Sequence, residues 1–252
     1  MHYQTKYYLS IVLLLSCTLL PKQNLYKKGI ENYQKKDYEK AITYFSDFYK
    51  KSPAGDSTLF YLYNCYIMIG NTEASIRILE ELAKRKNPNE QIYFNLFNYY
   101  RQTNLYYKII YLLLNSPIPV MQTLDQKYPL TQKLCAEIFA GVTTNKKIMN
   151  PIAYSIEKGF VRPAPDGKFY ETDTIKIGNF ILMLDSFLPP KNPDRFFPLK
   201  NIKSDSYLYI PYMRLVEYGI VNLDENINPE MHTLLSQGVR AICTLKNRGL
   251  IK

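Results

Sequence analysis

The chain has 252 residues, of which 46% are hydrophobic and 21% charged, so it can bury a core in one or two domains and is not a disordered tail. Its formal net charge is +10, but the lysines are scattered among acidic residues and do not form a stripe or a known binding motif. This balance argues against nucleic-acid binding and leaves a solvated cationic surface, or attraction to anionic lipid or wall polymer, as the interpretations.

The first predicted element is a short apolar leader. Lys6 precedes an apolar run from Leu9 to Cys17 that has the length of a signal-peptide core and is too short to span a bilayer. Its end, Leu14-Leu15-Ser16-Cys17, resembles the lipobox of bacterial lipoproteins, in which a peptidase cleaves before the cysteine and the thiol receives a diacylglycerol. The resemblance implies a signal peptide over 1–16, a lipid on Cys17 and a tether over 17–23. An export signal cleaved elsewhere, or an uncleaved anchor, is the alternative.

Residues 24–116 are predicted to form pairs of helices. Apolar positions fall at helical spacing on both sides of Lys35-Lys36-Asp37, and related patterns recur at a spacing of 34 residues. The first unit, with small residues at Gly29 and Ala41 and a final Pro53, resembles a tetratricopeptide repeat. The two later units match less well. The resemblance implies a short helical solenoid of three repeats, and a generic helical bundle is the alternative.

In that register, the first helix of each unit lines a concave face. The residues that the resemblance places on this face are Tyr26, Tyr33, Phe60, Asn64, Phe94, Asn98 and Arg101. Aromatic, amide and guanidinium groups together suit a peptide-binding groove, so an unidentified envelope protein is the predicted partner. Some repeats of this family hold a C-terminal carboxylate with lysines, but Tyr26 stands where one of these lysines belongs. The same face could instead pack against the rest of the chain.

The predicted boundary between the two halves is Ser116-Pro117-Ile118-Pro119, where prolines break the helical pattern. In the second half, about residues 125–252, Thr131 is expected to cap a helix over Gln132–Val142. Asp173-Thr174 is expected to cap a later helix, which Pro189-Pro190 stops.

Between these helices, a second resemblance emerges. A helix ending in Ile156-Glu157-Lys158-Gly159-Phe160-Val161, followed by Pro165-Asp166-Gly167-Lys168-Phe169, resembles a unit of the S-layer homology domain over about 144–189. A similar unit over about 197–250 has its exit at Gly219-Ile220-Val221, and Asn228-Pro229-Glu230 is expected to open its second helix. The Tyr128–Val142 segment resembles half of a preceding unit. The resemblance implies a compact, trefoil-like helical module.

The S-layer homology family typically binds cell-wall polysaccharide through a Thr-Arg-Ala-Glu motif at the start of the second helix. The resemblance makes Thr174 and Lys176 the possible glycan contacts in this chain. No arginine stands at the matching positions, and a lysine lacks the bidentate fork of arginine. Two interpretations therefore stay open: wall binding is retained, or these residues only form turns and caps.

The sequence contains no pattern that favours catalysis, a metal or a cofactor. Cys65, Cys135 and Cys243 lie far apart and are predicted to be buried free thiols, and His232 is expected alone in a helix. No hydrolase, zinc-protease, P-loop or dinucleotide motif occurs.

Taken together, the sequence predicts a mainly α, non-catalytic protein of the bacterial cell envelope. It is expected to be exported, to be held at a membrane through acylated Cys17 on the periplasmic or outer side, and to act as a protein-interaction scaffold or tether without a cofactor. A cell-wall polysaccharide-binding anchoring module is the alternative. No nucleic-acid partner is expected.

Overall fold

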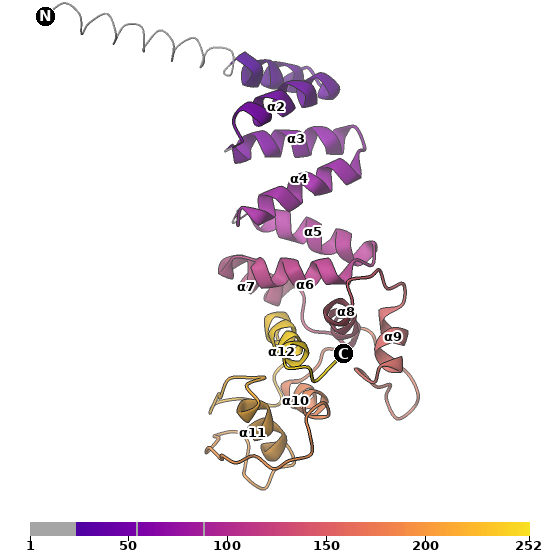
Figure 1. The fold of residues 1–252 in the computed structure, drawn as a ribbon, viewed down its shortest axis with the longest axis vertical. Coiled ribbons are helices and arrows are strands. Elements are labelled where there is room, and N and C mark those ends of the chain that lie inside the picture. Colours follow the sequence, from indigo (N-terminus) through magenta and orange to yellow (C-terminus); the bar gives the residue numbers. More distant parts are fainter. Residues whose placement is uncertain (1–23, 54, 88) are drawn as a thin grey trace, which may run out of the picture. The chain divides into compact units, whose positions relative to one another are not determined.

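The computed structural model describes residues 24–53, 55–87 and 89–252, and these residues are mainly helical (Figure 1). In this described part, β-type backbone pairing is limited to two isolated β-bridges. The prediction of a mainly α fold is therefore confirmed. The predicted signal peptide, Cys17 and the tether lie outside the described residues. Within the described part, no helix is long and apolar enough to cross a membrane.

The described residues divide into two compact units: unit 1 ends at residue 87, and unit 2 comprises residues 89–252. The helices of unit 1 are a stretch over residues 24–34, α2 (Tyr38–Lys51), α3 (Asp56–Met68) and α4 (Thr72–Lys84). Those of unit 2 are α5 (Glu90–Gln102), α6 (Tyr106–Asn115), α7 (Ile118–Lys127), α8 (Gln132–Thr143), α9 (Pro151–Glu157), α10 (Ile177–Asp185), α11 (Tyr209–Glu217) and α12 (Leu235–Asn247). Unit 2 thus includes α5 and α6, which the sequence pattern assigns to the last repeat.

The turns before α2, α4 and α6 share one backbone feature. The three helices begin thirty-four residues apart, as the apolar pattern predicts. A residue in the left-handed conformation precedes each of them: Lys36 (φ 60°), Gly70 (φ 74°) and Asn104 (φ 58°). Glycine and asparagine adopt this conformation readily, whereas lysine does so at a cost. The regular spacing therefore reflects a repeated helix–turn–helix geometry along the chain.

Aromatic packing forms much of the core of unit 1. Ala41 and Phe45 of α2 are fully buried. The Phe45 ring stacks on Tyr61 with a centroid separation of 5.0 Å. A Cβ atom on Gly29 would lie 2.6 Å from the Phe45 ring, so this close helix approach requires glycine. The small residues predicted at positions 29 and 41 thus serve helix packing.

In unit 2, α8 and α12 each pack on several other helices. α8 packs on α9, α12 packs on α7, and α10 packs on α11. α12 also packs on α8, and α8 packs on α6. The α6–α8 approach depends on Gly141, because a Cβ atom there would lie 2.5 Å from the backbone oxygen of Tyr106. Phe139 and Ile242 are fully buried in α8 and α12, so these two helices carry core residues.

Several predicted helix ends are confirmed. Thr131 caps α8, where its hydroxyl accepts from the Leu134 amide at 3.2 Å. Gly159 and Gly219 follow α9 and α11 in the left-handed conformation, with φ of 71° and 58°.

Two predicted helix starts are wrong. α10 begins at Ile177 with Lys176 as its N-cap, so Asp173-Thr174 does not cap it. α12 begins at Leu235, so Asn228-Pro229-Glu230 does not open it and His232 does not lie in a helix. The physical reason is that backbone groups of residues 171–176 and 229–233 bond to neighbouring segments of the unit, which holds them in extended or turn conformations.

Candidate functional site

The predicted groove residues are divided between the two units. In unit 1, the half-buried rings of Tyr26 and Tyr33 both pack edge-on against Tyr61, at centroid distances of 6.2 and 5.2 Å. Phe60 is half-buried on α3, and Asn64 is exposed one turn further along. The structure therefore brings the two predicted tyrosines together through a third one, and Asn64 is the solvent-facing member of this group.

In unit 2, the predicted residues Phe94 and Asn98 of α5 both contact the C-terminal end of α7, where Phe94 is buried and Asn98 stays exposed. The Lys127 ammonium lies 4.1 Å from the centroid of the Phe94 ring. The Tyr128 hydroxyl donates to the Asn98 side-chain oxygen at 3.0 Å. For Phe94, the geometry matches the alternative in which the face packs against the rest of the chain, whereas Asn98 stays exposed and bonded to Tyr128.

Arg101, the last predicted groove residue, forms a bidentate ion pair. Its Nε donates to Oε2 of Glu137 at 2.7 Å, and its Nη2 donates to Oε1 at 3.0 Å. The Glu137 side chain is 3% exposed, so burying its charged carboxylate without this partner would cost free energy. The pair borders a polar hollow of ≈ 500 Å³, where Lys133 and Glu171 form a second pair at 2.7 Å. Charges around this hollow are thus largely compensated within the chain.

Three segments that lead into α8, α10 and α12 meet in unit 2, and we name their meeting point the junction (residues 130–131, 174–176 and 231–233). Bridges join Thr131 to Thr174 and Lys176 to His232. The Ile175 amide donates to the Leu130 carbonyl at 2.9 Å, and the Ile175 carbonyl accepts from Thr233 at 2.8 Å. The middle segment is therefore held on both edges.

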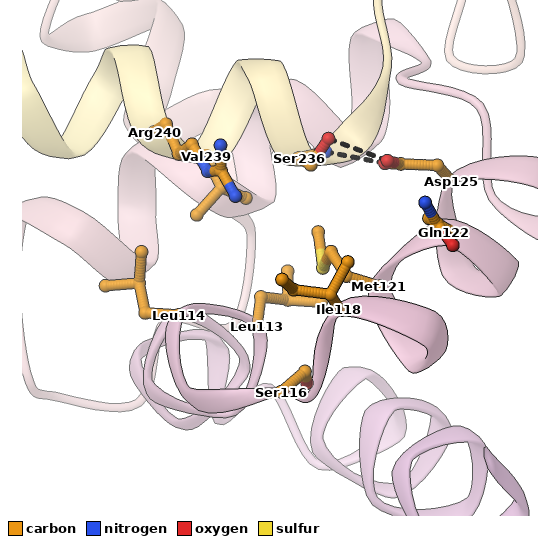
Figure 2. Close-up of a pocket in the computed structure, with 10 residues that line it drawn as sticks. All are labelled: Leu113, Leu114, Ser116, Ile118, Met121, Gln122, Asp125, Ser236, Val239 and Arg240. Atoms are coloured by element: carbon orange, nitrogen blue, oxygen red, sulfur yellow. Dashed lines mark hydrogen bonds between the residues drawn. The ribbon is translucent and has the colours of Figure 1, made fainter. Parts of the chain in front are cut away.

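In each of these three helices, an amide of the first turn donates to an oxygen from another segment of unit 2. For α8, the Gln132 amide donates to the Asp173 carbonyl at 2.9 Å; for α10, the Ile177 amide donates to the Met231 carbonyl at 2.8 Å. For α12, the Ser236 amide donates to the Asp125 carboxylate at 2.7 Å (Figure 2). In α12 the acceptor is therefore a side-chain carboxylate, whereas in α8 and α10 it is a backbone carbonyl.

The two predicted glycan contacts lie at the junction, and each is bonded to another side chain. Thr174 Oγ1 and His232 Nδ1 are hydrogen-bonded at 2.8 Å. Lys176 Nζ forms an ion pair with Glu230 at 2.7 Å. Both partners come from the segment before α12, more than fifty residues away, so the local sequence pattern could not reveal them. A glycan would have to compete with these contacts.

A pocket of ≈ 360 Å³ adjoins Thr174, and we name it the Thr174 pocket. Phe160 and Ile175 give it buried apolar lining, and Gln132 and Asn179 add amide groups. Arg162 lines it as an exposed cation with no ion pair among the described residues. The sequence prediction missed Arg162, although it directly follows the recognised Gly159-Phe160-Val161 exit.

A second hollow, which we name the apolar cleft, opens between α6, α7 and α12 (Figure 2). Its volume is ≈ 270 Å³, and Leu113, Ile118, Met121 and Val239 are among the side chains that line it. The sequence predicted only a helix break here. The facing residues lie more than one hundred positions apart, so no local pattern unites them.

The three cysteines in the described part of the chain are free thiols. Cys65 and Cys135 are buried, which confirms the prediction for them, and Cys243 is partly buried. Burial raises the pKa of both Cys65 and Cys243 to about 11, so these thiols are protonated and poorly nucleophilic at neutral pH. Among the residues that the structure describes, no group of three or more His, Cys, Asp or Glu side chains could hold a metal ion.

Comparison with known proteins adds no relative. The chain matches no protein-family model, and no curated protein sequence is significantly similar to it. Any function therefore rests on the residues and the geometry given above.

Proposed function

We propose that this chain is a non-catalytic scaffold or tether of the bacterial cell envelope, which binds another envelope protein and is anchored to a membrane through acylated Cys17. The observation that carries the proposal is the regular helix–turn–helix spacing of α2, α4 and α6, with a left-handed residue at each turn. This spacing supports a tetratricopeptide-like array, in which stacked helix pairs present a surface to a partner. The lipobox-like sequence supports the anchor.

The protein-binding part can be tested by photocrosslinking in cells. A photoreactive residue is placed at Asn64, which is exposed on the predicted face, and for comparison at Glu73 of α4, whose side chain is 79% exposed. The proposal expects one defined envelope protein to be captured from Asn64 and not from Glu73. Equal capture from both positions, or none from Asn64, contradicts it.

The anchor can be tested by metabolic labelling with a fatty-acid analogue. The proposal expects label on the wild-type chain and none on Cys17→Ala, because the thiol is the attachment atom. Two or three acyl chains give stable attachment, since each buried methylene contributes about 0.8 kcal/mol. Equal labelling of both chains, or no label on the wild type, rules out the lipidated form.

The second candidate function is binding of an acidic cell-wall glycan at the Thr174 pocket. The observation that favours it is the combination of an apolar lining, amide groups and the unpaired Arg162 guanidinium, which can hold a carboxylate with two hydrogen bonds. Purified sacculi with their attached polymer provide the ligand. Binding that is lost in Arg162→Ala and weakened in Lys176→Ala supports this candidate, and absence of binding at any salt concentration dismisses it.

A further inference from the structure

The apolar cleft exposes hydrophobic side chains continuously from its floor to solvent. Leu113 and Val239 are almost fully buried at its base, whereas Leu114 is 53% and Ile118 is 73% exposed at its rim. Exposed apolar surface that leads into a hollow is typical of recognition sites. The volume of ≈ 270 Å³ falls just below the range of roughly 300–1,000 Å³ usual for small-molecule sites, which suits one inserted side chain.

One acidic and one basic side chain, Asp125 and Arg240, also line the cleft. Both carboxylate oxygens of Asp125 are engaged by Ser236, one with the amide and one with the hydroxyl, each at 2.7 Å (Figure 2). Arg240 lines the cleft as an exposed side chain, and its guanidinium has no ion pair or hydrogen bond among the described residues. Asp125 keeps its negative charge, but its oxygens already accept from Ser236, so the charged group free to bond a ligand is the Arg240 guanidinium, whose forked donors match a carboxylate.

Unit 2 as a whole has a positive formal charge. Residues 89–252 contain nineteen Lys and Arg against fourteen Asp and Glu. A net positive field of this kind favours the approach of an acidic partner.

We propose that the apolar cleft binds a segment of a partner protein that inserts an apolar side chain between Ile118 and Val239 and places a neighbouring carboxylate on Arg240. This surface is separate from the predicted face of unit 1. The inference rests on the proposed scaffold function only in that the chain acts by binding protein. It specifies the chemistry of the bound segment: one bulky apolar residue next to Asp or Glu.

A peptide array tests the apolar part. The probes are acetylated and amidated peptides with a central Leu, Ile, Phe or Met, flanked by Asp or Glu, by Ser, or by Lys, and they are offered to the full chain. We expect acidic flanks to bind more tightly than serine flanks, and lysine flanks to bind most weakly. Ile118→Ser should weaken binding roughly tenfold, because it removes an apolar contact with the inserted side chain at the rim of the cleft. Met149→Ser is the matched control, because Met149 is also 73% exposed but does not line the cleft.

A charge reversal tests the polar part. Arg240→Glu should invert the preference, so that lysine-flanked peptides become the tightest ligands. Arg195→Glu makes the same change of charge at an exposed arginine outside the cleft and should leave the preference unchanged. A preference that does not invert, or equal effects of the two substitutions, overturns the proposal.

Other occupants would give different results. If Ile118→Ser dissociates a dimer in light scattering, the occupant is a second copy; if it abolishes binding to anionic vesicles with no effect on peptides, the occupant is lipid. Either result overturns the proposal. Failure here is distinct from failure of the scaffold function, because crosslinking from Asn64 does not depend on Ile118.

Discussion

Arg101 has a different role in the structure from the one that the sequence pattern predicts. By its position in the repeat register, Arg101 is expected in a binding groove, but its guanidinium holds the carboxylate of Glu137 in α8. Glu137 is flanked by buried apolar residues in α8, and its side chain is 3% exposed. A buried acid of this kind needs a cationic partner, and the partner lies thirty-six residues away along the chain.

Arg101→Leu should destabilise the protein by about 3 kcal/mol, at the lower end of the range for breaking a buried pair, because Arg101 itself is 29% exposed. The loss arises because the Glu137 carboxylate stays buried without a partner. Urea unfolding followed by circular dichroism measures it. The double variant with Arg101→Leu and Glu137→Leu is the control and should recover most of the stability. A double variant as unstable as the single one would contradict this account.

Cys65 allows a prediction that depends on pH. Burial raises the pKa of its thiol from the ordinary value of 9.0 to about 11. Below pH 9, the folded protein should therefore hold about a hundredfold less thiolate at this position than the unfolded chain does. Iodoacetamide labelling at pH 8, followed by mass spectrometry, should modify Cys65 at least that much more slowly in buffer than in urea.

The same shift fixes the sign of a stability effect. Because the folded-state pKa lies above the unfolded value, the contribution of this thiol to stability is complete below pH 9 and is lost as the pH rises to about 11. Cys65→Ala should remove this part of the decrease in stability at alkaline pH. Equal slopes of stability against pH for the two proteins between pH 9 and 11 would contradict the assignment.

At the scale of elements, the helices of unit 2 are easier to predict than the segments between them. Thr131 gave a correct helix start because its hydroxyl satisfies a local amide, three residues along. The predicted starts of α10 and α12 were wrong. The side chains of their N-cap residues, Lys176 and Leu234, make no cap hydrogen bond, so the local sequence carries no cap signal. Groups from distant segments accept from the amides that follow them.

Asp125 is the residue that carries this role for α12. Asp125→Ala should destabilise the protein by about 1–2 kcal/mol, as loss of a helix cap does, because the Ser236 amide and hydroxyl both lose their acceptor. Amide hydrogen exchange should accelerate first in the opening turn of α12. Asp125→Asn keeps one acceptor oxygen and should cost less. Similar exchange rates at Ser236 in Asp125→Ala and the wild type would show that another group caps the helix.

At the scale of the whole molecule, the division into units follows tertiary packing. The proline-rich Ser116–Pro119 segment was the predicted boundary because it breaks the helical pattern. The compact units of the described part meet near residue 88, and α6 packs on α8 through Gly141. A break in helical periodicity marks the end of an element, and whether it also ends a domain depends on the contacts that cross it.

Residues 89–252 should therefore fold as an isolated fragment. They contain eight helices, α5 to α12, and their own buried core. We expect a cooperative urea transition and dispersed amide resonances for this fragment. The comparison fragment, residues 117–252, begins at the predicted boundary, lacks α5 and α6 and should be much less stable. Equal stability of the two fragments would show that α6 is not part of this folding unit.

The sequence by itself determined the helical class, the thirty-four-residue spacing, the Thr131 cap and the glycine turns. These features depend on local periodicity and on the conformational range of single residues, which neighbouring positions specify. Tertiary structure alone decided that Arg101 pairs with Glu137, that Thr174 and Lys176 contact His232 and Glu230, and that Ile118 and Arg240 share a cleft. Each of these contacts joins residues distant in the chain, and one sequence carries no periodic signal for such a contact.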